Sequence, residues 1–101
     1  MNGQYEEIYQ QAERLHYRFR DVVDQPDAPE MQRLRAETKE LLDAIESDKK
    51  PRSIEDLVKR IMSELDRIKE GDGTLMDSSD ADELRDEYED LRQELQELPN
   101  Y

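Results

Sequence analysis

Hydrophobic side chains recur along most of this chain at steps of three and four residues, the spacing of one face of an α-helix. The pattern is clearest in its last third, where a narrow stripe is formed by Ala81, Leu84, Tyr88, Leu91, Leu95 and Leu98. Such a stripe is typical of a helix that packs one edge against another helix. We therefore predict a helix over residues 80–98 that is held in place by this stripe.

Three further segments, residues 4–23, 29–47 and 54–70, have the same periodicity. The first has a wide apolar arc made of Tyr5, Ile8, Ala12, Leu15, Phe19 and Val22, flanked by Tyr9, His16 and Val23. The second has a narrower stripe of Met31, Leu34, Thr38, Leu41 and Ile45, with Leu42 beside it. The third has the widest arc, with Ile54, Leu57, Val58, Ile61, Met62, Leu65 and Ile68. Because a wide arc contacts several neighbours, we expect the third helix at the centre of the core.

Proline and capping residues mark the joints between these segments. Pro26 and Pro29 end the first helix, since proline neither donates a hydrogen bond nor tolerates a helical residue before it. Asp27, Ser53 and Asp80 are the expected N-caps of the second, third and fourth helices, each with an acid three residues later. The sequence thus predicts one helix in each of the four segments.

The longest break is residues 71–79, and within it Leu75 and Met76 are expected to pack onto the core. Short joints between the first three helices favour antiparallel neighbours. We predict a single all-α domain over residues 1–101, a small antiparallel bundle of four helices. The alternative is a three-helix core with an acidic, coiled-coil-like fourth helix.

Charge narrows the classes of function. The chain has 28 acids against 15 lysines and arginines, a net charge of −13, and no cysteine. Phosphates would be repelled, so nucleic acid is not expected as a direct ligand. No apolar run is long enough to span a membrane, and the first residues do not resemble a signal peptide. With no thiol or disulfide chemistry, a cytoplasmic location is expected.

The acids concentrate in residues 71–101, where only Arg85 and Arg92 are basic. Opposite the stripe lie Asp82, Glu83, Asp86, Glu87, Glu89, Asp90, Glu94 and Glu97. Like charges four residues apart on a helix oppose one another by a few tenths of a kcal/mol, about 0.2–0.5 each. Several interpretations remain open: a solvated face that aids solubility, an adaptation to a saline cytosol, a face that binds a basic protein, and a mimic of nucleic-acid phosphates.

The candidate partner-binding residues combine these acids with one aromatic side chain. Tyr17 falls outside the apolar arc of its helix, so it is either solvated or an interface anchor. The full set is Tyr17, Asp82, Asp86, Glu89, Asp90, Glu94 and Glu97.

Motifs for metal chemistry are incomplete. Glu13 and His16 have the Glu-x-x-His spacing of di-iron bundles, but such sites need two motifs and this chain has one histidine. Residues 72–83 have acids at both ends of a calcium-loop length, yet Asp77 replaces the glycine that the loop requires. Paired acids such as Asp86 and Asp90 lack a phosphate loop or nucleophile beside them. We therefore predict no catalytic residue, no metal ligand and no cofactor.

The sequence favours a small, acidic, non-enzymatic protein that acts as an adaptor or regulator by binding another protein, one with a basic surface. The first alternative is a nucleic-acid mimic that inhibits a basic DNA- or RNA-binding protein, and the second is a metal-dependent all-α enzyme. The stripe over residues 80–98 packs antiparallel either within the chain or across a homodimer formed by the first and fourth helices.

Overall fold

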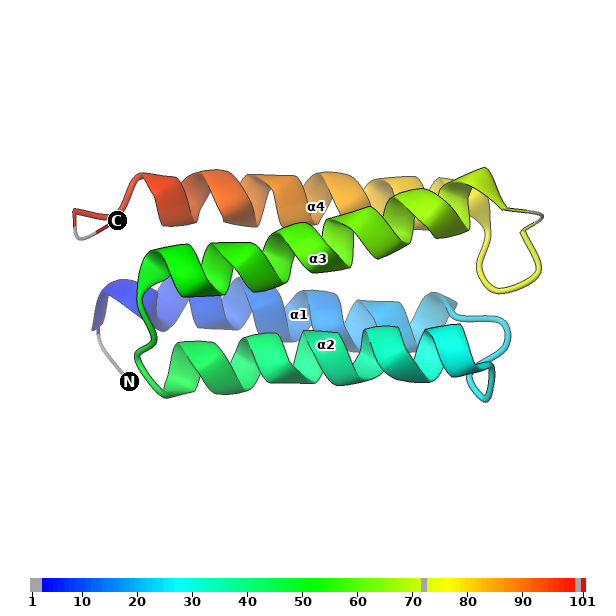
Figure 1. The fold of residues 1–101 in the computed structure, drawn as a ribbon, viewed down its shortest axis with the longest axis horizontal. Helices are drawn as coiled ribbons and strands as arrows, with labels where there is room; N and C mark the ends of the chain where they lie inside the picture. Colours follow the sequence, from blue (N-terminus) through cyan, green and yellow to red (C-terminus); the bar gives the residue numbers. More distant parts are fainter. Residues whose placement is uncertain (1–2, 72, 100) are drawn as a thin grey trace.

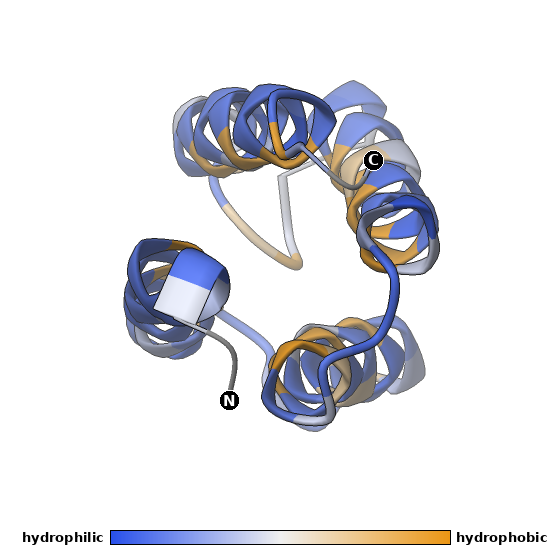
Figure 2. Cartoon of the chain, turned by 90° about the vertical axis from the view of Figure 1, so that its left-hand side faces the viewer, coloured by the Kyte–Doolittle hydropathy of each residue, from blue (hydrophilic) through white to orange (hydrophobic). Residues whose placement is uncertain are grey.

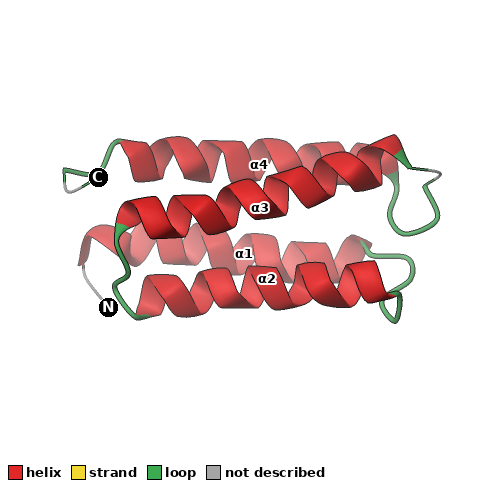
Figure 3. Cartoon of the chain, viewed as in Figure 1, coloured by secondary structure: helices red, strands yellow, loops and turns green. Residues whose placement is uncertain are grey.

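The helical pattern of the sequence becomes a bundle in the computed structural model, which describes residues 3–71, 73–99 and 101 (Figure 1). A short 3-10 helix, Gly3–Tyr5, leads into the first α-helix. The four α-helices are α1 (Glu6–Val22), α2 (Pro29–Glu46), α3 (Pro51–Glu70) and α4 (Ser78–Gln96). They run alternately in opposite directions and are joined at the ends of the bundle (Figure 3). The predicted all-α antiparallel four-helix bundle is confirmed.

The fourth helix is an integral member of the bundle. α1 packs against α2 and α4, and α3 packs against α2 and α4, so the four helices close into a ring. The contact between α3 and α4 is the most extensive. The alternative of a three-helix core is therefore wrong, because the stripe of α4 is buried at Ala81, Leu84, Tyr88, Leu91 and Leu95.

The apolar faces meet along the axis of the ring, as the hydropathy colouring of Figure 2 shows. The predicted stripe of α2 is buried, including Thr38, and so is most of the predicted arc of the first helix, including His16. Tyr9, Val22 and Val23 are only partly covered. The widest arc is also buried, at Ile54, Val58, Ile61, Met62, Leu65 and Ile68. Leu57 is the exception, since it is only partly covered. Helix periodicity thus identifies nearly the whole core.

Two of the predicted N-caps are wrong, and so is one helix start: the second helix begins at residue 29 as predicted, whereas the third begins before the predicted residue 54. α2 begins at Pro29 and α3 at Pro51, and neither Asp27 nor Ser53 acts as the N-cap. Proline is favoured at the first helical position because its ring presets φ, and the N–H it lacks would have had no partner there. The two prolines therefore set the starts more strongly than the hydroxyl and carboxyl side chains nearby.

The start of α4 also differs from the prediction. Asp77 is the N-cap and its carboxylate accepts a hydrogen bond from the backbone N–H of Ser79 at 2.8 Å. Asp80 lies in the first turn, where an acid is stabilised by the helix dipole. The helix ends at Gln96, before the predicted Leu98.

The segment between α3 and α4 folds back onto the end of α1. Met76 is completely buried and forms an isolated antiparallel bridge with Val23. The backbone N–H of Asp24 donates to the carbonyl of Leu75 at 2.9 Å. Gly73 turns this segment with a φ of 79°, a value that favours glycine. The expected packing of Leu75 and Met76 onto the core is confirmed.

Among the described residues, no helix has both the length and the hydropathy that a bilayer-spanning segment needs.

Candidate partner-binding surface

Acids in the N-terminal half of α4 are paired with cations of the neighbouring helices. The carboxylate of Asp82 lies 2.7 Å from Nζ of Lys69 on α3. On the other side, the guanidinium of Arg18 on α1 contacts Glu83 at 2.5 Å and Glu87 at 2.7 Å. The fold therefore neutralises part of the charge that the sequence places on this helix.

A polar cluster ties the C-terminal half of α4 to α3. Arg92 binds Glu89 at 2.6 Å and approaches Glu55 at 3.5 Å. Gln96 donates to the same Glu55 carboxylate at 2.6 Å, and the hydroxyl of Tyr101 donates to its other oxygen. Burial alone would raise the pKa of Glu55, but the hydrogen bonds from Tyr101 and Gln96 hold it below its ordinary value. Sequence reasoning missed Glu55, which is 2% exposed.

We call the acidic surface the set formed by four acids of α4 and by Glu7 of α1, whose charge acts on Glu94. The four acids of α4 are Asp86, Asp90, Glu94 and Glu97. All five are exposed, and within the described part of the chain none of them forms an ion pair. Loss of solvent, followed by the negative charges of Glu7, Asp90 and Glu97, raises the pKa of Glu94. The last turn of α4 carries no base, although the helix dipole favours a cation there. This face of α4 thus holds negative charge that no ion pair within the described residues neutralises.

The seven predicted binding residues separate into three groups. Asp82 and Glu89 are engaged in ion pairs within the chain, which leaves them less available to a partner. The acids at positions 86, 90, 94 and 97 share the acidic surface. Tyr17 lies apart from them, 54% exposed, in a groove lined by α1, α2 and the segment between them.

The Glu-x-x-His motif is used for packing. His16 is 8% exposed, and its Nδ1 lies 2.7 Å from the hydroxyl of Thr38 on α2. In residues 3–71, 73–99 and 101, no three imidazole or carboxylate groups gather in a way that could hold a metal ion. Asp72, the first position of the calcium-loop candidate, lies outside the described residues.

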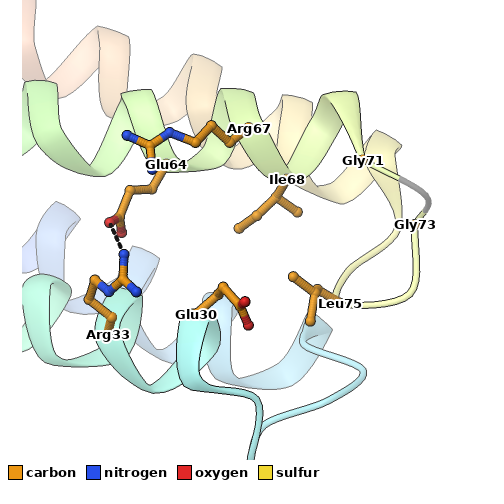
Figure 4. A pocket seen from close by; sticks show the side chains of 8 residues that line it. All are labelled: Glu30, Arg33, Glu64, Arg67, Ile68, Gly71, Gly73 and Leu75. Atoms are coloured by element: carbon orange, nitrogen blue, oxygen red, sulfur yellow. Dashed lines mark ion pairs between the residues drawn. The ribbon is translucent and has the colours of Figure 1, made fainter.

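A small pocket of about 200 Å³ opens where α2, α3 and the segment after α3 meet. Figure 4 shows Ile68 of α3 and Leu75 of that segment pointing into it. Its rim is charged, with Arg33 of α2 reaching Glu64 of α3 at 3.9 Å (Figure 4). Arg67 of α3 and Glu30 of α2 complete the charged part of the lining. An apolar floor under equal numbers of acids and bases gives this pocket no preference for ligand charge.

Glu64 of this rim also interacts with a second carboxyl group, that of Glu37 on α2. One oxygen of Glu37 and one of Glu64 are buried with no hydrogen-bond partner among the described residues. Burial, together with the charge of Glu64 and a hydrogen bond to it, raises the pKa of Glu37 to about 7. The pair therefore keeps a proton at pH values well above those at which a carboxyl group ordinarily releases it.

Comparisons with protein-family models, with curated proteins and with solved structures find no match to this chain.

Proposed function

We propose that this protein is a non-enzymatic adaptor or regulator that binds a basic surface of another protein through its acidic surface. The observation that carries the proposal is the absence of ion pairs at Asp86, Asp90, Glu94 and Glu97 in the described structure. Other acids of α4, at positions 82, 83, 87 and 89, are paired with Lys69, Arg18 or Arg92. The acids of α4 are therefore of two kinds: some are paired with cations of the same chain, and others remain available to pair with cations of a partner.

Unpaired acids at this position weaken the free protein. Asp86, Asp90 and Glu94 repel one another at four-residue spacing, and the last turn places Glu94 at the negative end of the helix dipole. A cationic partner would relieve both effects. It would also be attracted from a distance, because a charged face accelerates encounter with an oppositely charged surface.

The nucleic-acid mimic is the second candidate, and charge density counts against it. Residues 86, 90, 94 and 97 carry about one charge per 6 Å of helix, from the ~1.5 Å rise per residue. Double-stranded DNA carries one charge per roughly 1.7 Å. The acidic surface therefore suits a short cluster of lysines and arginines better than a long DNA-binding cleft.

We also propose that the protein is cytoplasmic and that it is not an enzyme. A reducing compartment suits a chain without cysteine. The half-buried Glu37, whose pKa is raised, has Arg33 and Arg60 rather than a nucleophile among the groups around it. A metal-dependent enzyme has no support from these contacts.

Affinity purification from host lysate tests the surface with a matched pair of variants. The acidic-surface variant is Asp90→Asn/Glu94→Gln. The control variant is Asp21→Asn/Asp56→Asn, which removes the same charge from exposed positions of α1 and α3. We expect a partner that co-purifies with the wild type and with the control variant, but is at least tenfold depleted with the acidic-surface variant.

The salt dependence of the purified pair then separates the two candidates. A protein partner held by a few ion pairs and apolar contacts loses affinity modestly as the salt concentration rises, whereas a mimic held in a nucleic-acid cleft by many ion pairs loses affinity much more steeply. Equal recovery of every partner with both double variants would overturn the acidic surface as the binding site.

A further inference from the structure

A groove on the outer face between α1 and α2 has more cations than carboxylates in its lining. Its volume is about 680 Å³, within the ~300–1,000 Å³ range of small-molecule clefts. The lining contains three cations, Arg20, Arg35 and Lys39, against two carboxylates, Glu13 and Asp27. On a chain with a net charge of −13, this is a locally positive site.

Two of the three cations are free to bind an anion. Lys39 is shared with Asp43 at 3.4 Å. Arg20 and Arg35 form no ion pair within the described part of the chain, and both are exposed. A long polyanion would be repelled by the whole protein, so these guanidinium groups suit a small anion of one or two charges.

The only histidine of the chain forms part of the groove wall, and its tautomer follows from its hydrogen bonds. The hydroxyl of Thr38 donates to the carbonyl of Arg35 at 2.9 Å. Its oxygen therefore accepts from Nδ1–H of His16 at 2.7 Å, which leaves Nε2 without a proton in the neutral ring. Burial and the charges of Arg20, Arg35 and Lys39 lower the pKa of His16, while Glu13 opposes them.

An aromatic platform lies beside these groups. Tyr17 is the single large hydrophobic side chain that is exposed among the described residues. Its ring meets the ring of His16 edge-on, with centroids 5.6 Å apart, and the guanidinium of Arg20 lies 5.9 Å from its centroid. A flat ligand can stack on such a ring while an attached oxyanion reaches the arginine.

We propose that this groove binds a small aromatic oxyanion, with its ring on Tyr17 and its phosphate or carboxylate held by Arg20 and Arg35 beside His16. The site is separate from the acidic surface, and the proposal goes beyond the binding of a basic partner. An anion in the groove offsets the cations that keep His16 neutral. Ligand binding and protonation of His16 therefore reinforce each other, since linkage between two sites is reciprocal.

The histidine resonances provide the test, because one histidine gives one titration curve. Adenosine 5′-monophosphate is the probe, with inorganic phosphate and adenosine as its two halves. We expect the monophosphate to raise the titration midpoint of His16, whereas adenosine, which carries no charged phosphate, should leave the midpoint unchanged. An unchanged midpoint at saturating monophosphate would overturn the proposal.

Three variants locate the ligand. Arg35→Gln should weaken monophosphate binding at least tenfold, whereas Arg14→Gln removes an exposed arginine of α1 outside the groove and should leave binding unchanged. Tyr17→Leu should weaken the monophosphate while leaving the weaker binding of inorganic phosphate as it was. Equal losses in Arg35→Gln and Arg14→Gln would show general electrostatics, and equal affinity for monophosphate and phosphate would exclude the aromatic platform.

Discussion

At the scale of single residues, two buried tyrosines differ in one hydrogen bond. Tyr5 and Tyr88 are each 1% exposed. The hydroxyl of Tyr5 donates to the carbonyl of Lys49 at 2.6 Å, which fastens the start of the chain to the joint between α2 and α3. The hydroxyl of Tyr88 has no partner among the described residues, and burial raises its pKa. A buried hydroxyl without a hydrogen-bond partner lowers the stability of the folded state.

We expect opposite effects when each tyrosine is replaced by phenylalanine. Tyr5→Phe should lower the free energy of unfolding by about 1 kcal/mol, because it removes a donor and leaves the Lys49 carbonyl without it. Tyr88→Phe should be neutral or raise it by up to about 1 kcal/mol, because no bond is lost. Urea denaturation of both variants measures the difference. Equal destabilisation by the two changes would mean that the Tyr88 hydroxyl is hydrogen-bonded in solution.

At the scale of helices, α2 and α3 are joined partly through the Glu37–Glu64 pair. The pKa of Glu37 is about 7 in the folded chain, against an ordinary value of 4.5. Between these values the folded state binds more protons than the unfolded state, so stability falls as the pH rises from about 4.5 to about 7. The groups that face Glu37 besides Glu64 are Arg60 and Arg33, which lower its pKa.

Glu37→Gln should remove this dependence. The amide supplies a permanent donor toward Glu64, so the variant should be more stable than wild type at pH 8 and lose less stability between pH 5 and pH 8. Glu40→Gln, an exposed change on the same helix, is the control and should leave the wild-type profile unchanged. Thermal unfolding across this pH range measures both; parallel profiles for wild type and Glu37→Gln would contradict the account.

The helices themselves were predictable, whereas the polar contacts between them were not. Periodicity gave the buried stripe of each helix because burial repeats with the helix turn. The ion pair of Arg18 with Glu83 joins residues 65 apart, and no local pattern indicates it. One feature of the sequence did indicate that Glu55 is buried. It precedes Val58 by three residues and Met62 by seven, so it lies on the same face of the helix as these two core residues. Its partners, on α4 and at Tyr101, could be recognised only in the folded chain.

At the scale of the whole molecule, α4 has two different faces. Its apolar stripe packs against the other helices, and its opposite face carries the acidic surface. The stripe of α4 is used inside the bundle, so the intramolecular antiparallel packing is the one the structure has. A homodimer through the same stripe would have to displace it from the core. The proposed binding of a basic partner uses the opposite face, which needs no rearrangement of the helices.

Replacing Leu91, which is completely buried, tests where the stripe packs. Leu91→Glu should unfold the protein, because an unpaired carboxylate in the core costs about 3–5 kcal/mol. Gln93→Glu adds the same charge at an exposed position and should leave the protein folded. Sedimentation and circular dichroism measure both variants. A dimeric wild type that becomes a folded monomer in Leu91→Glu would place the stripe between chains instead.

The central claim is that the acidic surface holds repulsion that the fold does not relieve, and the free energy of unfolding tests it most directly. At low salt, Asp90→Asn/Glu94→Gln should be more stable than wild type by about 0.5–1 kcal/mol, from lost repulsion and helix-dipole cost. In 1 M salt, where screening acts within about 3 Å, this gain should largely disappear. Asp21→Asn/Asp56→Asn should give a smaller gain, because each acid has an arginine three or four residues away and only Asp21 lies in the last turn of its helix. An equal gain in both double variants, or a loss in the first, would contradict the claim.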